Sequence, residues 1–277
     1  MSDDSKDEKS KGTVDSTINA MAGLAKEVPI YQDAVQPAAK EIGKALCTVT
    51  KTVNVALSPV SALIWGYDQV KDFVNNKISE KLQNVPLENI VTPPTHIAGP
   101  ALESLRYTGA IEELKELYAN LIASSMDSST TERVHPSFVE IIKQLSADEA
   151  ILLKAFISKN QEPIITIRSN ENAKDVGYDE FRHFSLLGEE MNCSNHKQIP
   201  NHLDNLSRLG IIEIPAQYQL SDEEFYKPLE EHPFVLKIKE KILEEDRRIP
   251  KIKRKTVILT GLGELFVDTC VQDHQDV

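Results

Sequence analysis

The chain has 277 residues, of which 40% are hydrophobic and 27% are charged, and its formal net charge is -12. This length suits one large domain or two ordinary ones, and the apolar content excludes a chain that is disordered throughout. The acidic balance excludes indiscriminate binding of the whole surface to DNA or to anionic lipid.

The amino-terminal residues and the cysteines indicate a cytoplasmic protein. The opening MSDDSKDEKSKG is polar and charged, so we expect a disordered tail over 1–13. A secretion signal needs an uninterrupted apolar run behind a basic start, and this opening has none. The three cysteines, Cys47, Cys193 and Cys270, lie far apart. This usage favours buried thiols in a reducing compartment.

Residues 14–144 are predicted to form a helical domain. Pro37 suits the first turn of a helix that runs on to Leu57, and the pair Ser58-Pro59 suits the start of a second helix over 60–82. An apolar span over 42–67 runs through both helices, but Lys44, Lys51 and Pro59 interrupt it. We therefore predict amphipathic helices packed on their neighbours rather than a membrane-spanning segment. Triggered association of these helices with a membrane surface stays open.

The most regular pattern of the chain lies over 99–127. Apolar residues recur there at three or four positions, with a break at Thr108-Gly109 and charged residues on the opposite side. Pro136 suits the first turn of a shorter helix over 135–146. The sequence therefore predicts several packed helices in this region.

A dense set of polar residues accompanies these helices. The set consists of Arg106, Asn120, Ser124, Asp127 and His135. Asn120 and Ser124 are four positions apart and share a helix face. We interpret the set either as a surface for partner recognition or switching, or as a buried hydrogen-bond network that fixes helix packing.

Residues 145–277 are predicted to form a winged helix-turn-helix domain, so that the whole chain is mainly α with a small β wing. Ser146 precedes Glu149 at the spacing of a capping box. The elements expected after this start are a strand over 163–168, helices over 178–191 and 199–210, a strand over 211–214, a helix near 233–246, a strand over 255–259 and a last helix capped by Thr260. Helix, glycine, strand, long connection, strand and helix is the order of a winged helix.

Two features of this domain match a DNA-binding regulator, which is the alternative function. The first is the helix over 199–210, which a helix-turn-helix protein places in the major groove. Its candidate contacts are Asn201, Asn205 and Arg208. The second is a basic run made of Arg247, Arg248, Lys251, Lys253, Arg254 and Lys255. A solvated loop explains such a run equally well, and the domain as a whole is acidic.

No pattern in the sequence points to catalysis, a cofactor or a metal. The chain has no G-x-x-x-x-G-K-[ST], no G-x-G-x-x-G and no G-x-S-x-G. Cys193, His196 and His202 give only part of a zinc site, because a fourth ligand is missing. We therefore expect a protein that works by binding.

Three sequence blocks between residues 100 and 146 resemble one protein family. They are PALESLRY over 100–107, LYANLIASSMD over 117–127, and the stretch from His135 to Ser146. Their order and spacing are similar to those of the Abi-alpha family of bacterial abortive-infection proteins, over about 40–160. The resemblance implies a role in phage defence and brings no catalytic motif. The expected partner is a phage or host component, and self-association stays open.

Overall fold

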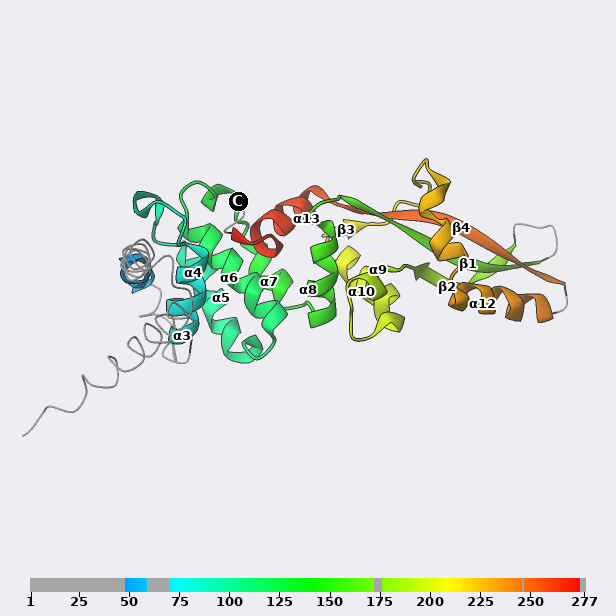
Figure 1. Ribbon diagram of the computed structural model, residues 1–277, viewed down its shortest axis with the longest axis horizontal. Helices are drawn as coiled ribbons and strands as arrows, with labels where there is room; N and C mark the ends of the chain where they lie inside the picture. Colours follow the sequence, from blue (N-terminus) through cyan, green and yellow to red (C-terminus); the bar gives the residue numbers. More distant parts are fainter. Residues whose placement is uncertain (1–47, 59–69, 172–175, 246, 275–277) are drawn as a thin grey trace, which may run out of the picture. The chain divides into compact units, whose positions relative to one another are not determined.

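The computed structural model describes residues 48–58, 70–171, 176–245 and 247–274. Over these ranges the chain is mostly helical and carries one four-stranded antiparallel sheet (Figure 1). The residues from Val49 onward group into one compact unit. The tail predicted over 1–13, the helix start predicted at Pro37 and the first part of the helix predicted over 60–82 lie outside the described residues.

Helix α6, Glu112–Met126, is the centre of the helical region. Most of its residues are buried, and it contacts α5, α7 and α8. The helical segments up to α8 are residues 48–58, α3 Lys71–Phe73, a π-helical turn Val74–Ile78, α4 Ser79–Lys81, η4 Leu87–Asn89, α5 Thr95–Thr108, α6, η5 Thr131–Arg133, α7 Ser137–Ile142 and α8 Ala147–Leu153. Over the described ranges, each helix is too short or too polar to cross a bilayer.

Several local predictions for this region are confirmed. The break at Gly109 separates α5 from α6, and Pro136 directly precedes α7. Ser146 caps α8 through a complete capping box. Its hydroxyl accepts the Glu149 N–H at 3.3 Å, and the Glu149 carboxylate accepts the Ser146 N–H at 2.7 Å. These features depend on residues three or four positions apart, which is why sequence spacing reveals them.

The sheet has the strand order β2-β1-β4-β3. Its strands are β1 Gln161–Glu171, β2 Gly177–Phe184, β3 Ile212–Glu213 and β4 Arg248–Leu259. β1 pairs with β4 along its whole length, from Gln161 opposite Ile258 to Glu171 opposite Arg248. β3 pairs only with the last two residues of β4, so the rest of β4 has β1 as its one strand neighbour among the described residues.

Two sequence predictions for this region need correction. Residues 177–184 form strand β2, not the first part of a helix over 178–191, and only α9, Leu187–Glu190, is helical there. The pairing of β2 with β1 is irregular, and His183 has a positive φ of 54°. This irregularity puts Phe181 and Phe184 against the same core, so their spacing of three imitates a helix. The basic run also belongs to β4 from Arg248 onward, not to a solvated loop.

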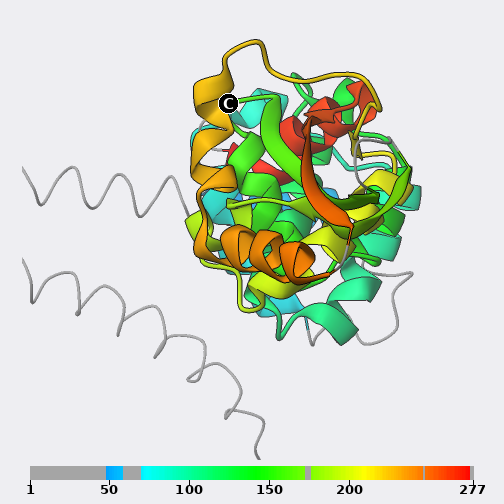
Figure 2. The same cartoon turned by 90° about the vertical axis from the view of Figure 1, so that its right-hand side faces the viewer.

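The remaining helices are η6 Lys154–Phe156, η7 His196–Gln198, α10 Ile199–Arg208, η8 Glu223–Phe225, α11 Lys227–Glu230, α12 Pro233–Glu244, α13 Gly261–Phe266 and a π-helical turn Val267–Val271. Among them, α10, α12 and α13 correspond to predicted helices, whereas η6, η7, η8 and α11 were not predicted. Gly210 ends α10 with a φ of 76°, a conformation that glycine adopts without strain. α12 runs beside β4, with both drawn in orange (Figure 1 and Figure 2).

Two hydrophobic cores hold these elements together. The larger core runs from the helical region to the inner end of the sheet, and it includes residues of α13 and the turn Val267–Val271. The smaller core lies between the sheet and α11–α12, and it is formed by Ile165, Ile167, Phe184, Tyr226, Leu229, Val235 and Ile242. The boundary predicted between residues 144 and 145 stays a prediction.

Candidate functional site

Two members of the predicted polar set join α6 to the carboxyl-terminal turn. The Asn120 side-chain amide donates to the Cys270 carbonyl at 3.0 Å, and the Ser124 hydroxyl donates to the Thr269 carbonyl at 3.1 Å. All of these groups are buried. The bonds therefore connect the last described elements of the chain to the centre of the helical region.

His274, which the sequence did not single out, completes this cluster. Its Nδ1 lies 3.3 Å from the Ser124 hydroxyl, and its Nε2 lies 3.4 Å from Asp127 Oδ2. Asp127 also accepts the Ser129 N–H at 2.8 Å. We call Asn120, Ser124, Asp127 and His274 the C-terminal clasp. Some 150 positions separate Ser124 from His274, so no local spacing could reveal the contact.

The clasp contains the residue types of a nucleophilic triad, but its geometry favours a structural role. Ser124, Asp127 and His274 are 4%, 6% and 6% exposed, so a substrate has no direct access to them. The Ser124 hydroxyl directs its proton to the Thr269 carbonyl, whereas a triad serine gives its proton to the imidazole. The arrangement resembles a buried polar network that holds two distant segments together, although Asn120 Oδ1 and His274 Nε2 accept or donate no hydrogen bond in it.

The environment of His274 makes the clasp sensitive to pH. Burial lowers the pKa of His274 below its usual 6.5, and the neighbouring Asp127 carboxylate offsets part of that shift. The charge of Asp273 also raises the pKa of His274, whereas the charge of Lys81 lowers it further. The unfolded chain therefore takes up a proton at a higher pH than the folded chain does. The stability that neutral His274 contributes is complete above pH 6.5 and is lost progressively as the pH falls below it.

We expect His274→Gln to reduce the loss of stability on acidification. Urea unfolding of the wild type and the variant, at about pH 7.5 and about pH 5.5, brackets the usual titration of histidine. The wild type should lose more free energy of unfolding between these conditions than the variant does. His196→Gln is a matched control, since His196 is exposed, and it should keep the wild-type dependence. Equal losses in all three proteins would contradict the inference.

The two other members of the polar set lie outside the clasp. The Arg106 guanidinium lies 5.8 Å from the centre of the Tyr107 ring, near the end of α5. His135 is exposed, and its Nδ1 accepts the Ser137 N–H at 3.1 Å at the first turn of α7. The five residues predicted as one set thus occupy three separate places.

The residues predicted on α10 for DNA contact mostly bind their own chain. The Asn205 amide donates to Glu149 Oε1 at 2.8 Å, and Arg208 donates to Asn205 Oδ1 at 2.7 Å and to Gln144 Oε1 at 3.0 Å. Asn201 is exposed and donates to the side chain of Gln198. α10 is therefore fixed to the start of α8 by the side chains expected to read bases.

The cations of the basic run are divided between the two faces of β4, because side chains alternate along a strand. Arg254 lies on the face covered by α11–α12, where its guanidinium pairs with Glu230 at 2.6 Å and Glu223 at 3.2 Å. These two carboxylates raise the pKa of Arg254. Arg248 shares that face and lies 5.1 Å from the centre of the Tyr178 ring.

The other cations of the run lie elsewhere. Lys251, Lys253 and Lys255 alternate with Arg254 and occupy the opposite face of β4. Arg247, just before the strand, is exposed and has a φ of 65°. The run is therefore not a single basic surface.

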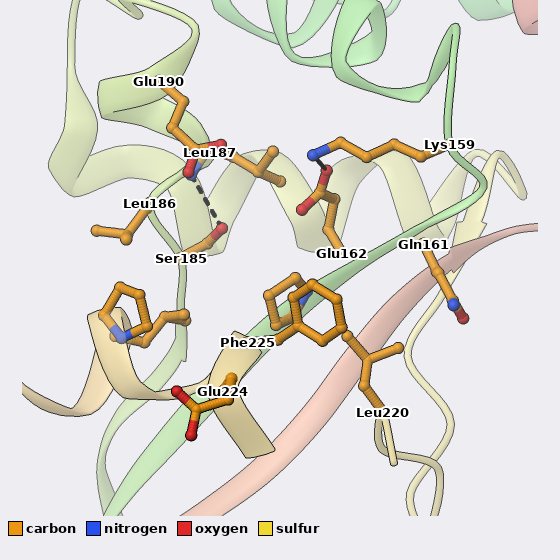
Figure 3. A pocket seen from close by; sticks show the side chains of 13 residues that line it. Lys159, Gln161, Glu162, Ser185, Leu186, Leu187, Glu190, Leu220, Glu224 and Phe225 are labelled. Atoms are coloured by element: carbon orange, nitrogen blue, oxygen red, sulfur yellow. Dashed lines mark hydrogen bonds and ion pairs between the residues drawn. The ribbon is translucent and has the colours of Figure 1, made fainter. Parts of the chain in front are cut away.

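A pocket of about 430 Å³ opens beside the inner end of β1 (Figure 3). Its walls include Leu187 and Phe225, and its polar side holds Glu162 in an ion pair with Lys159. Burial raises the pKa of Glu162, and the Glu190 carboxylate adds to this effect. None of the residues predicted as functional lines this pocket.

The segment that begins at Cys193, which the sequence offered as part of a zinc site, packs against the start of α8 at Asp148. Cys193 is buried with its Sγ 3.8 Å from the Asp148 carbonyl, and burial raises the pKa of its thiol to about 11. The Asp148 carboxylate accepts the N–H groups of Ser194 and Asn195 at 2.9 and 3.2 Å. Across the described ranges, no group of three or more candidate metal ligands occurs. Cys270 is also buried, with its pKa raised by burial, whereas Cys47 lies outside the described residues.

These features define a mostly helical protein with one antiparallel sheet, whose carboxyl-terminal turn is bonded to its central helix. The family model described as abortive infection alpha matches residues 66–270. The chain belongs to this family. The match extends past the blocks noted in the sequence and includes the sheet and α13.

Comparisons with individual proteins add little to the family match. Among curated proteins, none matches the chain. A solved structure of an uncharacterized protein from the hydrocarbon-degrading marine bacterium Alcanivorax borkumensis SK2 is 17% identical to it, with a TM-score of 0.35. The alignment covers 52% of this chain and 96% of that one. A similarity this low does not define a shared fold.

Proposed function

We propose that this protein acts in bacterial defence against phage, by binding a phage or host component and then halting growth of the infected cell. The observation that carries the proposal is the family match over residues 66–270, which spans both the helical region and the sheet. A function by binding rather than catalysis is supported by the burial of the clasp. Its serine, histidine and aspartate are too little exposed for a substrate to reach them directly.

We further propose that the carboxyl-terminal half works as an enlarged winged helix. Its support is the helix α10 followed directly by β3, which pairs antiparallel with β4, in the chain order α8, β1, β2, α9, α10, β3, α11, α12, β4. Strand β2 is an addition to the winged-helix order. α11 and α12 enlarge the connection between the two wing strands. Winged helices dock proteins as well as DNA, so the arrangement alone does not select the partner.

A phage-challenge growth curve tests the defence role. A sensitive host expressing the full chain is compared with a vector control, and with a truncation ending at Asp127, over a broad phage panel. We expect survival of the culture at low multiplicity of infection and collapse at high multiplicity, because infected cells stop growing before phage is released. Unchanged plaque number and burst size for all phages would overturn the proposal.

The substitution Ser124→Ala separates binding from catalysis by the clasp. The variant keeps the helix and removes only the hydroxyl, so protection should persist when the protein stays folded. The measurement is plaque number together with the thermal unfolding midpoint of the purified variant. Complete loss of protection at an unchanged midpoint would instead indicate a nucleophilic role for Ser124.

A further inference from the structure

One face of the β1–β4 pair gathers lysines on an otherwise acidic protein. Lys251 lies opposite Arg168, Lys253 opposite Thr166 and Lys255 opposite Ile164. Residues directly opposite in an antiparallel pair share a face. We call Lys251, Lys253 and Lys255, with Arg168 beside them, the lysine face. Successive lysines are about 7 Å apart along the strand, which gives a row about 14 Å long.

The opposite face of the same strands is covered. Ile252 and Ile167 pack there against the core formed with α11 and α12. Arg254 on that side is held by Glu230 and Glu223. Among the described elements, α11 and α12 therefore cover only one face of the outer sheet. Lys251 and Lys253 on the other face are exposed, and Lys255 is half-buried.

The border of the lysine face is formed by β2 and α10. Arg182 on β2 is 57% exposed, and its guanidinium lies 3.1 Å from the Asp204 carboxylate on α10. Arg168 pairs with Asp179 at 2.5 Å. Asp204 and Asp179, the two acids named at this border, are thus each paired with an arginine. They therefore neutralise less of the positive charge of the lysine row than unpaired carboxylates would.

The net charge of -12 does not prevent a local attraction for anions. The Debye length is about 8 Å at physiological ionic strength, so acids farther away are largely screened. Duplex nucleic acid carries one negative charge for about each 1.7 Å of its axis, so a row about 14 Å long faces roughly eight phosphate charges. A linear row of lysines suits this regular array.

We propose that the lysine face binds double-stranded nucleic acid through its phosphates, with α10 at the edge of the contact. This inference rests on the proposed function and names the chemistry of its partner. Lysines act as point charges and contribute position and affinity rather than base readout. Asn205 and Arg208 are bonded to their own chain, which also argues against reading of bases. The expected binding is therefore independent of sequence and strongly dependent on salt.

The test is fluorescence anisotropy of the full chain with a labelled duplex of mixed sequence, titrated at several salt concentrations. One variant combines Lys251→Gln, Lys253→Gln and Lys255→Gln. The matched control combines Lys227→Gln, Lys237→Gln and Lys241→Gln on α11–α12, which makes the same change of charge behind the sheet. The first variant should bind at least about tenfold more weakly, with its salt slope reduced by about 2 to 3. The control should keep the wild-type affinity within about twofold and the wild-type slope.

Three outcomes would overturn the proposal. The first is a wild type without duplex affinity at low salt, and the second is equal weakening by both triple variants. The third is a lysine-face variant that binds the duplex as the wild type does but self-associates. Lysines on an edge strand prevent edge-to-edge pairing, so this result would assign the lysines that role instead of binding. Thermal unfolding verifies that the variants are folded. If the triple variant unfolds, Lys251→Gln with Lys253→Gln, both at exposed positions, gives the same comparison with a smaller loss.

The binding assay contains no phage, so its result is distinct from that of the challenge experiment. Duplex binding that is lost only in the lysine-face variant supports the inference even when the wild type gives no protection. Protection without any duplex affinity leaves the defence role in place and overturns the nucleic-acid partner.

Discussion

Gly263→Ala is expected to lower the free energy of unfolding by about 3 kcal/mol, the upper end of the usual cost of overpacking. A Cβ at this position would lie 1.9 Å from the carbonyl oxygen of Ile211, which is backbone and cannot rotate away. The same carbonyl accepts the Thr260 N–H at 3.0 Å, so moving it also breaks a hydrogen bond. Helix α13 would have to separate from the end of α10.

Gly261→Ala is the matched control in the same helical turn. An added Cβ at Gly261 meets nothing within 4 Å, and the residue shows no positive φ. Removal of backbone freedom from the unfolded chain should make this variant more stable by up to about 1 kcal/mol. Urea unfolding of both variants gives the comparison. Two variants within about 0.5 kcal/mol of each other would show that α13 does not approach Ile211 this closely.

Phe266→Ala is expected to cost about 3–5 kcal/mol, as for other fully buried aromatic side chains. Phe266 is 0% exposed and packs edge-on against Phe138, with the ring centres 5.3 Å apart. Its loss leaves a cavity between α13 and α7, which the surrounding helices fill only in part. The expected result is a lower midpoint of urea unfolding with the native secondary structure retained in water.

Leu265→Ala controls for the loss of an apolar side chain from the same helix. Leu265 is 42% exposed, so the substitution should cost well under half as much as Phe266→Ala. Combining Phe266→Ala with Phe138→Ala should cost less than the two single losses together, by about 0.5–1.5 kcal/mol for the ring contact. Similar costs for Leu265→Ala and Phe266→Ala would contradict the described docking of α13.

The predictions for Gly263→Ala and Phe266→Ala both test how α13 and the residues after it pack against the helical region. The clasp joins the residues after α13 to α6 through the bonds of Asn120 and Ser124. Near the start of α13, the Thr260 hydroxyl donates to the Gly210 carbonyl at 2.5 Å. Loss of α13 packing should therefore weaken the helical core and the placement of α10 together. Variants of the lysine face lie apart from these contacts, which is why they can test nucleic-acid binding without this complication.

Elements that depend on near neighbours could be predicted from the amino-acid sequence. The apolar repeat of α6, the capping box at Ser146 and the glycine end of α10 at Gly210 each involve residues within a few positions. The blocks that resemble the abortive infection family also lie in short, continuous stretches of the chain. Hydrophobic period and capping chemistry act locally, so they can be read along the chain.

The meeting of distant residues, and the face that each residue occupies, depended on the tertiary structure. The irregular pairing of β2 with β1 places Phe181 and Phe184 on one core, within the stretch 178–191 that is predicted as a helix. The register of β1 with β4 divided the basic run between a covered and an open face. His274 joined Ser124 and Asp127 only because the chain end packs back on α6. Such contacts depend on the burial of whole surfaces against one another, which no spacing within a short segment encodes.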